Sequence, residues 1–294
     1  MTAQSQLYCF GFGYSAGRLL RRLGPDRHAG GTSRSGGTRG GLRLDAYSRD
    51  SPLPDPRARL ARVTHILVSI PPDDAGDPVA DLHGDDLAAL PNLRWLGYLS
   101  TTGVYGDTGG AWVDEDAPVS PGSERAARRA AAEQTWLGLW RDRGLPVHVF
   151  RLPGIYGPGR SAIDQLRAGT ARRIDKPGQV FSRIHVDDIA ATLQASMAAP
   201  DPGQIYNVAD DEPAPQAEVV AHAAALLGIE PPPLIPVDDD SLSEMARSFY
   251  AECRRVSNAR IKQALGVTLQ YPSYREGLAS ILAGESADLA DGAA

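Results

Sequence analysis

The organisation of this chain is set by residues 7–23, which read LYCFGFGYSAGRLLRRL. A short apolar run, a glycine-rich turn and a helix-like segment follow one another, as in the G-x-G-x-x-G/A pattern between a strand and a helix. Gly11 permits the tight turn, Gly13 lets a pyrophosphate approach the backbone, and Ala16 lets the helix pack on the strand. Free N–H groups of the first helical turn then face the phosphates. The pattern predicts a dinucleotide site formed by Gly11, Phe12, Gly13, Tyr14, Ser15 and Ala16; a turn without a ligand is the alternative.

Beyond this turn, strand-like and helix-like segments alternate, which predicts a parallel sheet with covered faces. Further strands are expected at residues 30–33, 42–45, 65–69, 95–100, 146–151 and 204–208. Helices are expected at residues 57–62, before Leu90 and at 123–141, and a strand–helix unit at 182–197. The expected fold class is therefore α/β, a Rossmann-type doubly wound parallel sheet with a smaller C-terminal α+β substrate lobe.

The alternation is lost after about residue 210, where proline-rich segments occur at 213–215 and 231–233. We expect residues 1–210 to form the nucleotide-binding domain, with a substrate-loop excursion at about 156–181. Residues 211–283 are then the substrate lobe. Residues 284–294 are small and acidic without an apolar period, which predicts a disordered tail.

Composition narrows the class of protein. The 294 residues are 42% hydrophobic, and the net charge of −6 argues against nucleic acid as the main partner. No apolar run approaches the roughly 20 residues needed to span a bilayer, and MTAQSQ leaves no room for a signal peptide before the first strand. The two cysteines and six histidines show no metal-ligand spacing. We expect a cytoplasmic protein with a small-molecule substrate, no metal, and neither a nucleic-acid nor a membrane partner.

The end of the second expected strand bears on the choice of dinucleotide. NAD sites usually place an acidic residue there, whereas NADP sites place an arginine for the 2′-phosphate. This strand ends in Thr32-Ser33-Arg34-Ser35, and a guanidinium suits a phosphate in charge and geometry. Ser33, Arg34 and Ser35 therefore favour NADP over NAD, with a solvated surface arginine as the alternative. Asp45 closes the third strand, where it would accept a hydrogen bond from the adenine amino group or serve as a plain turn residue.

Three later segments complete a resemblance: LSTTGVYG at 99–106, RLPGIYGPG at 151–159 and RIHVDD at 183–188. Together with the glycine turn they resemble the extended short-chain dehydrogenase/reductases, the epimerase/dehydratase-like enzymes, over residues 7 to about 282. The resemblance implies an NAD(P)-dependent oxidoreductase or epimerase acting on a small polar or sugar-nucleotide-like substrate. It also implies that Thr101 takes the catalytic Ser/Thr place. Ser69, Ile70 and Pro71 would flank the nicotinamide ribose, and Pro153 would also lie at the cofactor. Family members often pair through the two helices after the fourth and fifth strands, so a homodimer is possible.

The sequence departs from that family at the catalytic pair. Members usually carry Tyr-x-x-x-Lys on the helix after the fifth strand, but counting back from Glu133 places Arg129 at the lysine position and Arg125 at the tyrosine position. A guanidinium stays protonated, so Arg129 can position a ligand but neither arginine can exchange a proton. Tyr105, Tyr156 or bound water would then handle the proton. Ordinary salt-bridge spacing on a solvated helix is the alternative for the arginines, and a non-catalytic NADP(H)- or metabolite-sensing module is the alternative function.

Overall fold

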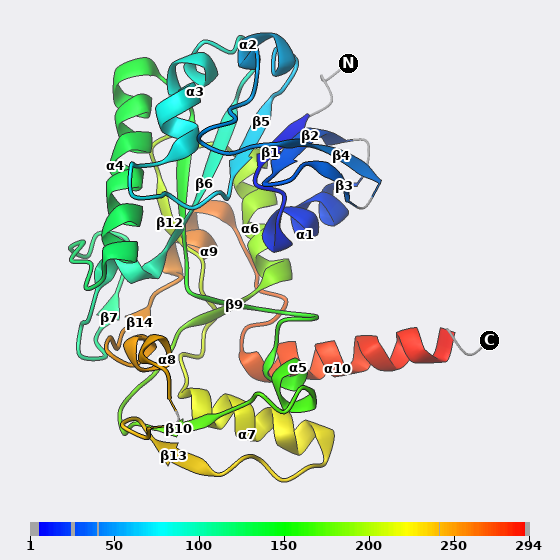
Figure 1. Ribbon diagram of the computed structural model, residues 1–294, viewed down its shortest axis with the longest axis vertical. Helices are drawn as coiled ribbons and strands as arrows, with labels where there is room; N and C mark the ends of the chain where they lie inside the picture. Colours follow the sequence, from blue (N-terminus) through cyan, green and yellow to red (C-terminus); the bar gives the residue numbers. More distant parts are fainter. Residues whose placement is uncertain (1–5, 25–26, 40, 241, 292–294) are drawn as a thin grey trace.

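The computed structural model describes residues 6–24, 27–39, 41–240 and 242–291. Its central sheet contains β1 (Leu7–Phe10), β2 (His28–Ser33), β3 (Gly37–Arg39), β4 (Leu42–Ala46), β5 (His65–Val68), β6 (Trp95–Thr101), β8 (Val147–Leu152) and β12 (Ile205–Asn207). The strand order is β12-β8-β6-β5-β1-β2-β4-β3 (Figure 1). All neighbours pair in parallel except β3 and β4. The expected Rossmann-type α/β fold is confirmed.

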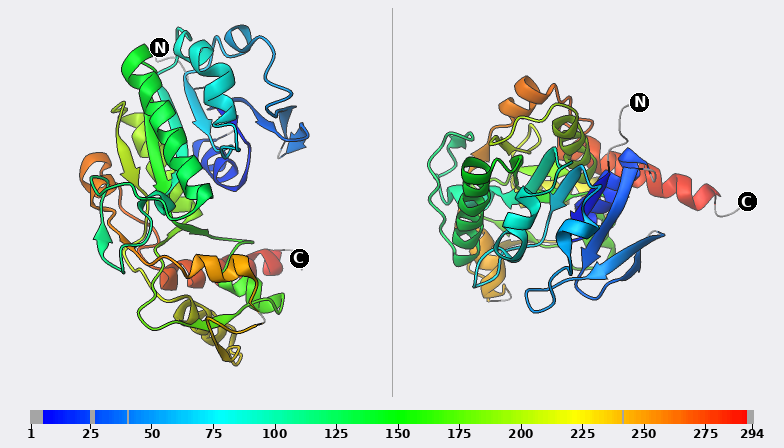
Figure 2. Two further views of the ribbon diagram at one scale, coloured as in Figure 1. Left: turned by 60° about the vertical axis from the view of Figure 1, so that its left-hand side comes forward. Right: turned by 90° about the horizontal axis from the view of Figure 1, so that it is seen from above.

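Helices cover both faces of this sheet, as Figure 2 shows from two further directions. They are α1 (Tyr14–Leu23) and α6 (Val186–Ala198) on one face, and α2 (Pro56–Arg59), α3 (Pro78–Ala88) and α4 (Glu124–Arg143) on the other. Successive side chains of a strand point to opposite faces, so β1 contributes to two cores. Leu7 and Cys9 join the core under α1 and α6, whereas Tyr8 and Phe10 join the core under α3 and α4.

The strand order reverses at β1, because β2 lies on one side of it and β5 on the other. In open α/β sheets, ligands bind at the carboxyl ends of the strands where the order reverses. The glycine turn after β1 and residues 69–71 after β5 both lie at this point of the sheet.

The other elements lie mostly below the carboxyl ends of the sheet (Figure 1). They are η2 (Thr102–Tyr105), β7 (Trp112–Val113), β9 (Gly154–Tyr156), α5 (Ala162–Arg167), β10 (Arg173–Asp175), β11 (Arg183–His185), α7 (Gln216–Leu227), β13 (Leu234–Pro236), α8 (Glu244–Phe249), β14 (Arg255–Val256), α9 (Ala259–Leu265) and α10 (Tyr274–Asp291). A separate apolar cluster, including Ile163, Val220 and Leu278, joins α5, α7 and α10. The division into two domains at residue 210 stays a prediction.

Three sequence-based expectations were wrong in detail. Residues 37–39 form the antiparallel strand β3, because Gly36 and Gly37 adopt positive φ and reverse the chain after β2. The helix expected at 57–62 is only Pro56–Arg59, since Leu60 and Val63 turn into the core ahead of β5.

The third correction concerns the C-terminus. Residues up to Asp291 continue α10, where a disordered tail was expected after residue 284. Extending an existing helix avoids the cost of nucleation, and alanine, leucine and glutamate favour the helical state. The helix extends beyond the other elements in Figures 1 and 2, and residues 292–294 lie outside the described part. Among the described residues, no helix is both long and apolar enough to cross a membrane.

Candidate functional site

The glycine turn is held between two strands. Gly11 has a φ of +87°, which is the left-handed region that glycine tolerates best. Its N–H donates to Thr32 Oγ1 at 2.9 Å, and the N–H of Phe12 donates to the Thr32 carbonyl at 2.7 Å. A Cβ on Gly11 would approach Ser69 Oγ to 2.8 Å. The turn is therefore fixed by β2 on one side and by the end of β5 on the other.

The N-terminus of α1 remains open to a ligand. Gly13 is the N-cap residue and provides no side-chain acceptor for the first helical turn. A Cβ added to Gly13 would meet no heavy atom within 4 Å. Ala16 is buried in the core under α1, as its role in helix packing requires. Bare N–H groups, open space and a positive helix dipole together fit a diphosphate. Ser15 is buried, and Tyr14 turns away to donate a hydrogen bond to the Pro158 carbonyl at 3.0 Å.

Residues expected at the nicotinamide end lie on neighbouring strands. The Ser69 hydroxyl donates to the Gly11 carbonyl at 2.5 Å, which ties the end of β5 to the turn, and Ile70 and Pro71 follow it. Thr101 ends β6, the next strand in the sheet, and its Oγ1 accepts a hydrogen bond from the Gly103 N–H at 3.1 Å. The hydroxyl proton of Thr101 therefore remains available for a substrate oxygen. Pro153 follows β8, one strand further along the sheet.

At the opposite end of the site, where the adenosine is expected, the structure brings in Arg39, which the sequence pattern did not predict as a site residue. Arg34 and Ser35 are exposed after β2, and Ser33 donates to the Gly36 carbonyl at 3.1 Å. From β3, Arg39 Nη1 donates to the Phe12 carbonyl at 2.9 Å, inside the glycine turn. No local pattern signals this contact, because it depends on the unexpected reversal of residues 37–39.

Asp45 is already engaged where an adenine contact was expected. Its Oδ2 accepts hydrogen bonds from Arg59 Nη2 at 2.6 Å and from the Tyr8 hydroxyl at 3.2 Å. An adenine amino group would have to share or replace these donors. The adenine role of Asp45 therefore stays a prediction that its contacts do not favour.

Arg125 and Arg129, the two arginines of α4 at the expected catalytic positions, differ in their surroundings. Arg129 Nη1 donates to the Leu99 carbonyl at 2.6 Å and to the Tyr98 hydroxyl at 3.3 Å, so its guanidinium is joined to β6. Arg125, one helical turn earlier, is exposed. The structure brings Arg129 to the sheet and leaves Arg125 at its carboxyl edge.

Tyr105 is buried beneath this edge in a hydrogen-bonded network. Its hydroxyl donates to Asn207 Oδ1 at 2.8 Å and accepts from Arg151 Nη1 at 2.9 Å. Arg151 in turn pairs with Glu133 at 2.7 Å. Burial raises the pKa of Tyr105, so its phenol stays protonated near neutral pH. This placement argues against Tyr105 as the group that exchanges a proton with a substrate.

Tyr156, the other expected candidate for proton transfer, and two further titratable side chains of this region are hydrogen-bonded or uncharged. The Tyr156 hydroxyl donates to the Ser273 carbonyl at 3.1 Å, and burial raises the pKa of Tyr156. Burial raises the pKa of Tyr98 as well. Burial lowers the pKa of His185 to about 4, so that imidazole is uncharged at neutral pH. None of these groups titrates near pH 7.

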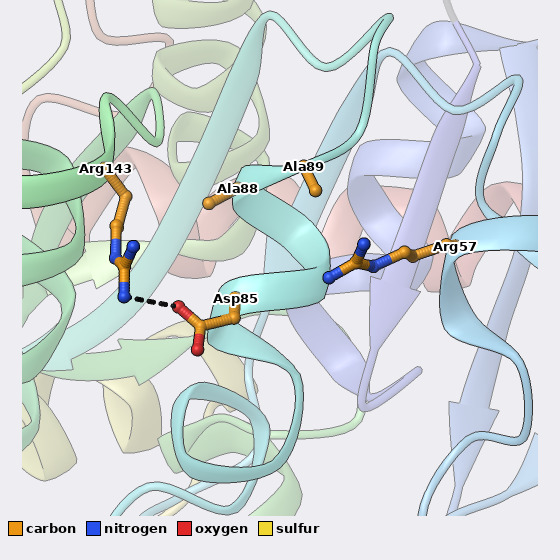
Figure 3. A pocket seen from close by; sticks show the side chains of 5 residues that line it. All are labelled: Arg57, Asp85, Ala88, Ala89 and Arg143. Carbon is orange, nitrogen blue, oxygen red and sulfur yellow. Dashed lines mark ion pairs between the residues drawn. The ribbon is translucent and has the colours of Figure 1, made fainter.

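A pocket lies away from this site, at the C-terminal ends of α3 and α4 (Figure 3). It is lined by Arg57, Asp85, Ala88, Ala89 and Arg143, and Arg143 approaches Asp85 at 3.4 Å. These helix ends lead into β6 and β8, so the pocket lies at the amino-terminal edge of the sheet, opposite the glycine turn. Over the part of the chain that the structure describes, no group of three or more His, Cys, Asp or Glu residues could hold a metal ion.

Comparison with known proteins agrees with this geometry. Residues 87–209 match the model of the NAD dependent epimerase/dehydratase family. A functionally unknown conserved protein from Silicibacter pomeroyi DSS is 49% identical and superposes with a TM-score of 0.86, covering 95% of this chain and 99% of that one. MoeE5 in complex with UDP-glucuronic acid and NAD is 20% identical, with a TM-score of 0.75 over 94% and 96% of the two chains, and so shares the fold.

Among curated proteins, a 3-diazoavenalumate denitrifying reductase from Streptomyces sp is 33% identical over an alignment of 183 residues that covers 56% of this chain. The chain spans 58% of the length of that relative. Residues 87–209 thus match the NAD-dependent epimerase/dehydratase family, the extended short-chain dehydrogenase/reductases, and the chain shares the fold of solved structures named for that family. Binding of NAD or NADP is typical of the family.

Proposed function

We propose that this protein is an oxidoreductase that binds NADP(H) and exchanges a hydride with a small polar or sugar-nucleotide-like substrate. The proposal rests mainly on the open N-terminus of α1 at Gly13. Ser69 and Thr101 lie at the same carboxyl edge of the sheet, after β5 and at the end of β6. When bound, the nicotinamide supplies or accepts the hydride. Two family features support a substrate of this kind: MoeE5 binds UDP-glucuronic acid, and the Streptomyces relative is named as a reductase.

The residues of this chain have separate roles in the proposal. The N–H groups after Gly13 hold the diphosphate, and Ser69 keeps the end of β5 against the turn. The Thr101 hydroxyl donates a hydrogen bond to the reacting substrate oxygen. Because burial raises the pKa of Tyr98, Tyr105 and Tyr156, water supplies the proton. The proposal includes a homodimer formed through the outer faces of α3 and α4.

The test is oxidation of NADPH in the presence of a panel of sugar nucleotides, aldehydes and keto acids. With a substrate that turns over, Thr101→Val should lower kcat about 10-fold to 100-fold, the loss of one hydrogen bond made in the transition state. Thr108→Val is the matched control, because the half-buried Thr108 hydroxyl donates to the carbonyls of Ala111 and Cys253 and has no role in the proposal. Full activity of Thr101→Val would remove Thr101 from the mechanism. Tight cofactor binding with no turnover would favour the non-catalytic sensing module, which the missing Tyr and Lys also suggest.

The cofactor preference is tested by titrating NADPH and NADH separately. The Arg39 guanidinium bonds the Phe12 carbonyl inside the turn, and Arg34 is exposed directly after β2, so we expect NADPH to bind at least about 10-fold tighter than NADH. Arg34→Ala should weaken NADPH binding by about that factor and leave NADH binding unchanged. Arg21→Ala, an exposed arginine at the other end of α1, is the control. Equal binding of the two cofactors by the wild-type protein would overturn the preference.

A further inference from the structure

Three arginines in the first half of α4 have different partners. Arg129 is bonded to the Leu99 carbonyl. Arg128 forms ion pairs with Asp74 and, at 4.0 Å, with Glu124. Arg125 is exposed, and within residues 6–24, 27–39, 41–240 and 242–291 no hydrogen bond or ion pair joins its side chain. The permanently charged guanidinium of Arg125, at the carboxyl edge of the sheet, therefore has no bonded partner among the described residues.

The contact of Arg129 locates Arg125 relative to the catalytic strand. Because α4 returns from the carboxyl edge, it runs antiparallel to β6, and Arg125 lies on the same helix face as Arg129. Four helical residues rise about 6 Å, and two strand residues advance about 6.6 Å. The Arg129 guanidinium is level with the Leu99 carbonyl, so an Arg125 side chain extended in the same way is level with Thr101.

A second contact supports this register. A Cβ placed on Gly103 would lie 3.7 Å from the Cβ of Ala126, so the first turn of α4 packs against the residues that follow Thr101. The nearby acids Asp74 and Glu124 pair with Arg128, which leaves the charge of Arg125 available to a ligand.

We propose that Arg125 binds a carboxylate of the substrate, on the part of the molecule that reacts beside Thr101. A guanidinium stays charged and grips a carboxylate through two parallel hydrogen bonds. The position that holds a proton-exchanging tyrosine in related enzymes then holds an anion anchor in this chain. The substrate class is a carbonyl or alcohol compound with a carboxylate close to the reacting carbon. This inference rests on the proposed function.

The experiment measures binding of matched probes to the NADP⁺-loaded protein by calorimetry. Phenylglyoxylate is compared with its methyl ester, and UDP-glucuronate with UDP-glucose, so that each pair differs by one carboxylate. We expect the carboxylate member of at least one pair to bind about 10-fold to 100-fold tighter. Arg125→Ala should abolish that difference, and Arg125→Lys should restore part of it. Arg141→Ala, an exposed arginine in the last turn of α4, should leave it unchanged.

Each other outcome counts against the proposal. It is overturned if the wild-type protein shows no carboxylate preference in either pair, or if Arg125→Ala keeps the preference. Equal tight binding of UDP-glucose and UDP-glucuronate, weakened equally by Arg125→Ala, would assign Arg125 to the diphosphate instead. Titration of NADPH into the same variants separates this inference from the proposed function. If NADPH binds but no carboxylate preference exists, only this inference fails; if NADPH does not bind, the proposed function fails.

Discussion

Gly13→Asp should lower the affinity for NADPH at least about 100-fold without destabilising the fold. The carboxylate would occupy the space that the diphosphate needs and would repel it, whereas no heavy atom of the protein lies within 4 Å of the new Cβ. Gly13 has a φ of −105° and caps α1, and aspartate is a preferred N-cap residue. The stability should therefore stay equal or rise by a few tenths of a kcal/mol.

Gly13→Asp should lower the NADPH affinity without lowering the stability, so loss of cofactor binding cannot be attributed to unfolding. NADPH titration by fluorescence measures the first effect, and urea unfolding measures the second. Gly138→Ala, in the middle of α4, is the control: its added methyl group meets only open space and the end of Arg141, so cofactor affinity should not change. Unchanged NADPH affinity in Gly13→Asp would mean that the turn does not hold the diphosphate, and the proposed function would lose its basis.

Glu133→Ala should cost about 3–5 kcal/mol of unfolding free energy. The side chains of Glu133 and Arg151 are only 1% and 2% exposed, and three hydrogen bonds join them. The Ser100 hydroxyl also donates to Glu133 Oε1 at 2.5 Å. Removing the carboxylate leaves the buried guanidinium of Arg151 without its counter-ion, and an unpaired buried charge strongly destabilises the folded state.

Urea unfolding of three variants separates the effect of an unpaired buried charge from the effect of lost side-chain packing. Glu133→Ala should be the least stable, and the double replacement Glu133→Leu with Arg151→Met should recover most of the loss, because no buried charge remains. Arg275→Ala breaks an exposed pair with Glu212, which solvent screens, and should lower the stability far less than Glu133→Ala does. A loss below about 1 kcal/mol for Glu133→Ala would show that water reaches Arg151.

Local residue patterns were sufficient for the parallel strands of the central sheet and for the glycine turn. Apolar runs such as residues 65–68 and 147–152 are buried parallel strands, because a strand covered on both faces must be apolar along its whole length. Gly11 was expected to make the tight turn, and its φ of +87° follows from that geometry. The same patterns failed at β3 and in α10, where a glycine pair reverses the chain and an existing helix continues through polar residues.

The roles of individual polar side chains depended on the tertiary structure. Arg39 reaches the carbonyl of Phe12 across 27 residues, and Tyr105 reaches Asn207 across 102 residues. Hydrophobic periodicity reports which face of an element is buried, but it carries no information on which distant partner a buried polar group meets. Folding therefore decides that the Tyr105 hydroxyl is bonded to Asn207 and that Arg129 is bonded to β6. It also decides that Arg128 forms ion pairs, whereas no hydrogen bond or ion pair joins the Arg125 side chain to the described residues.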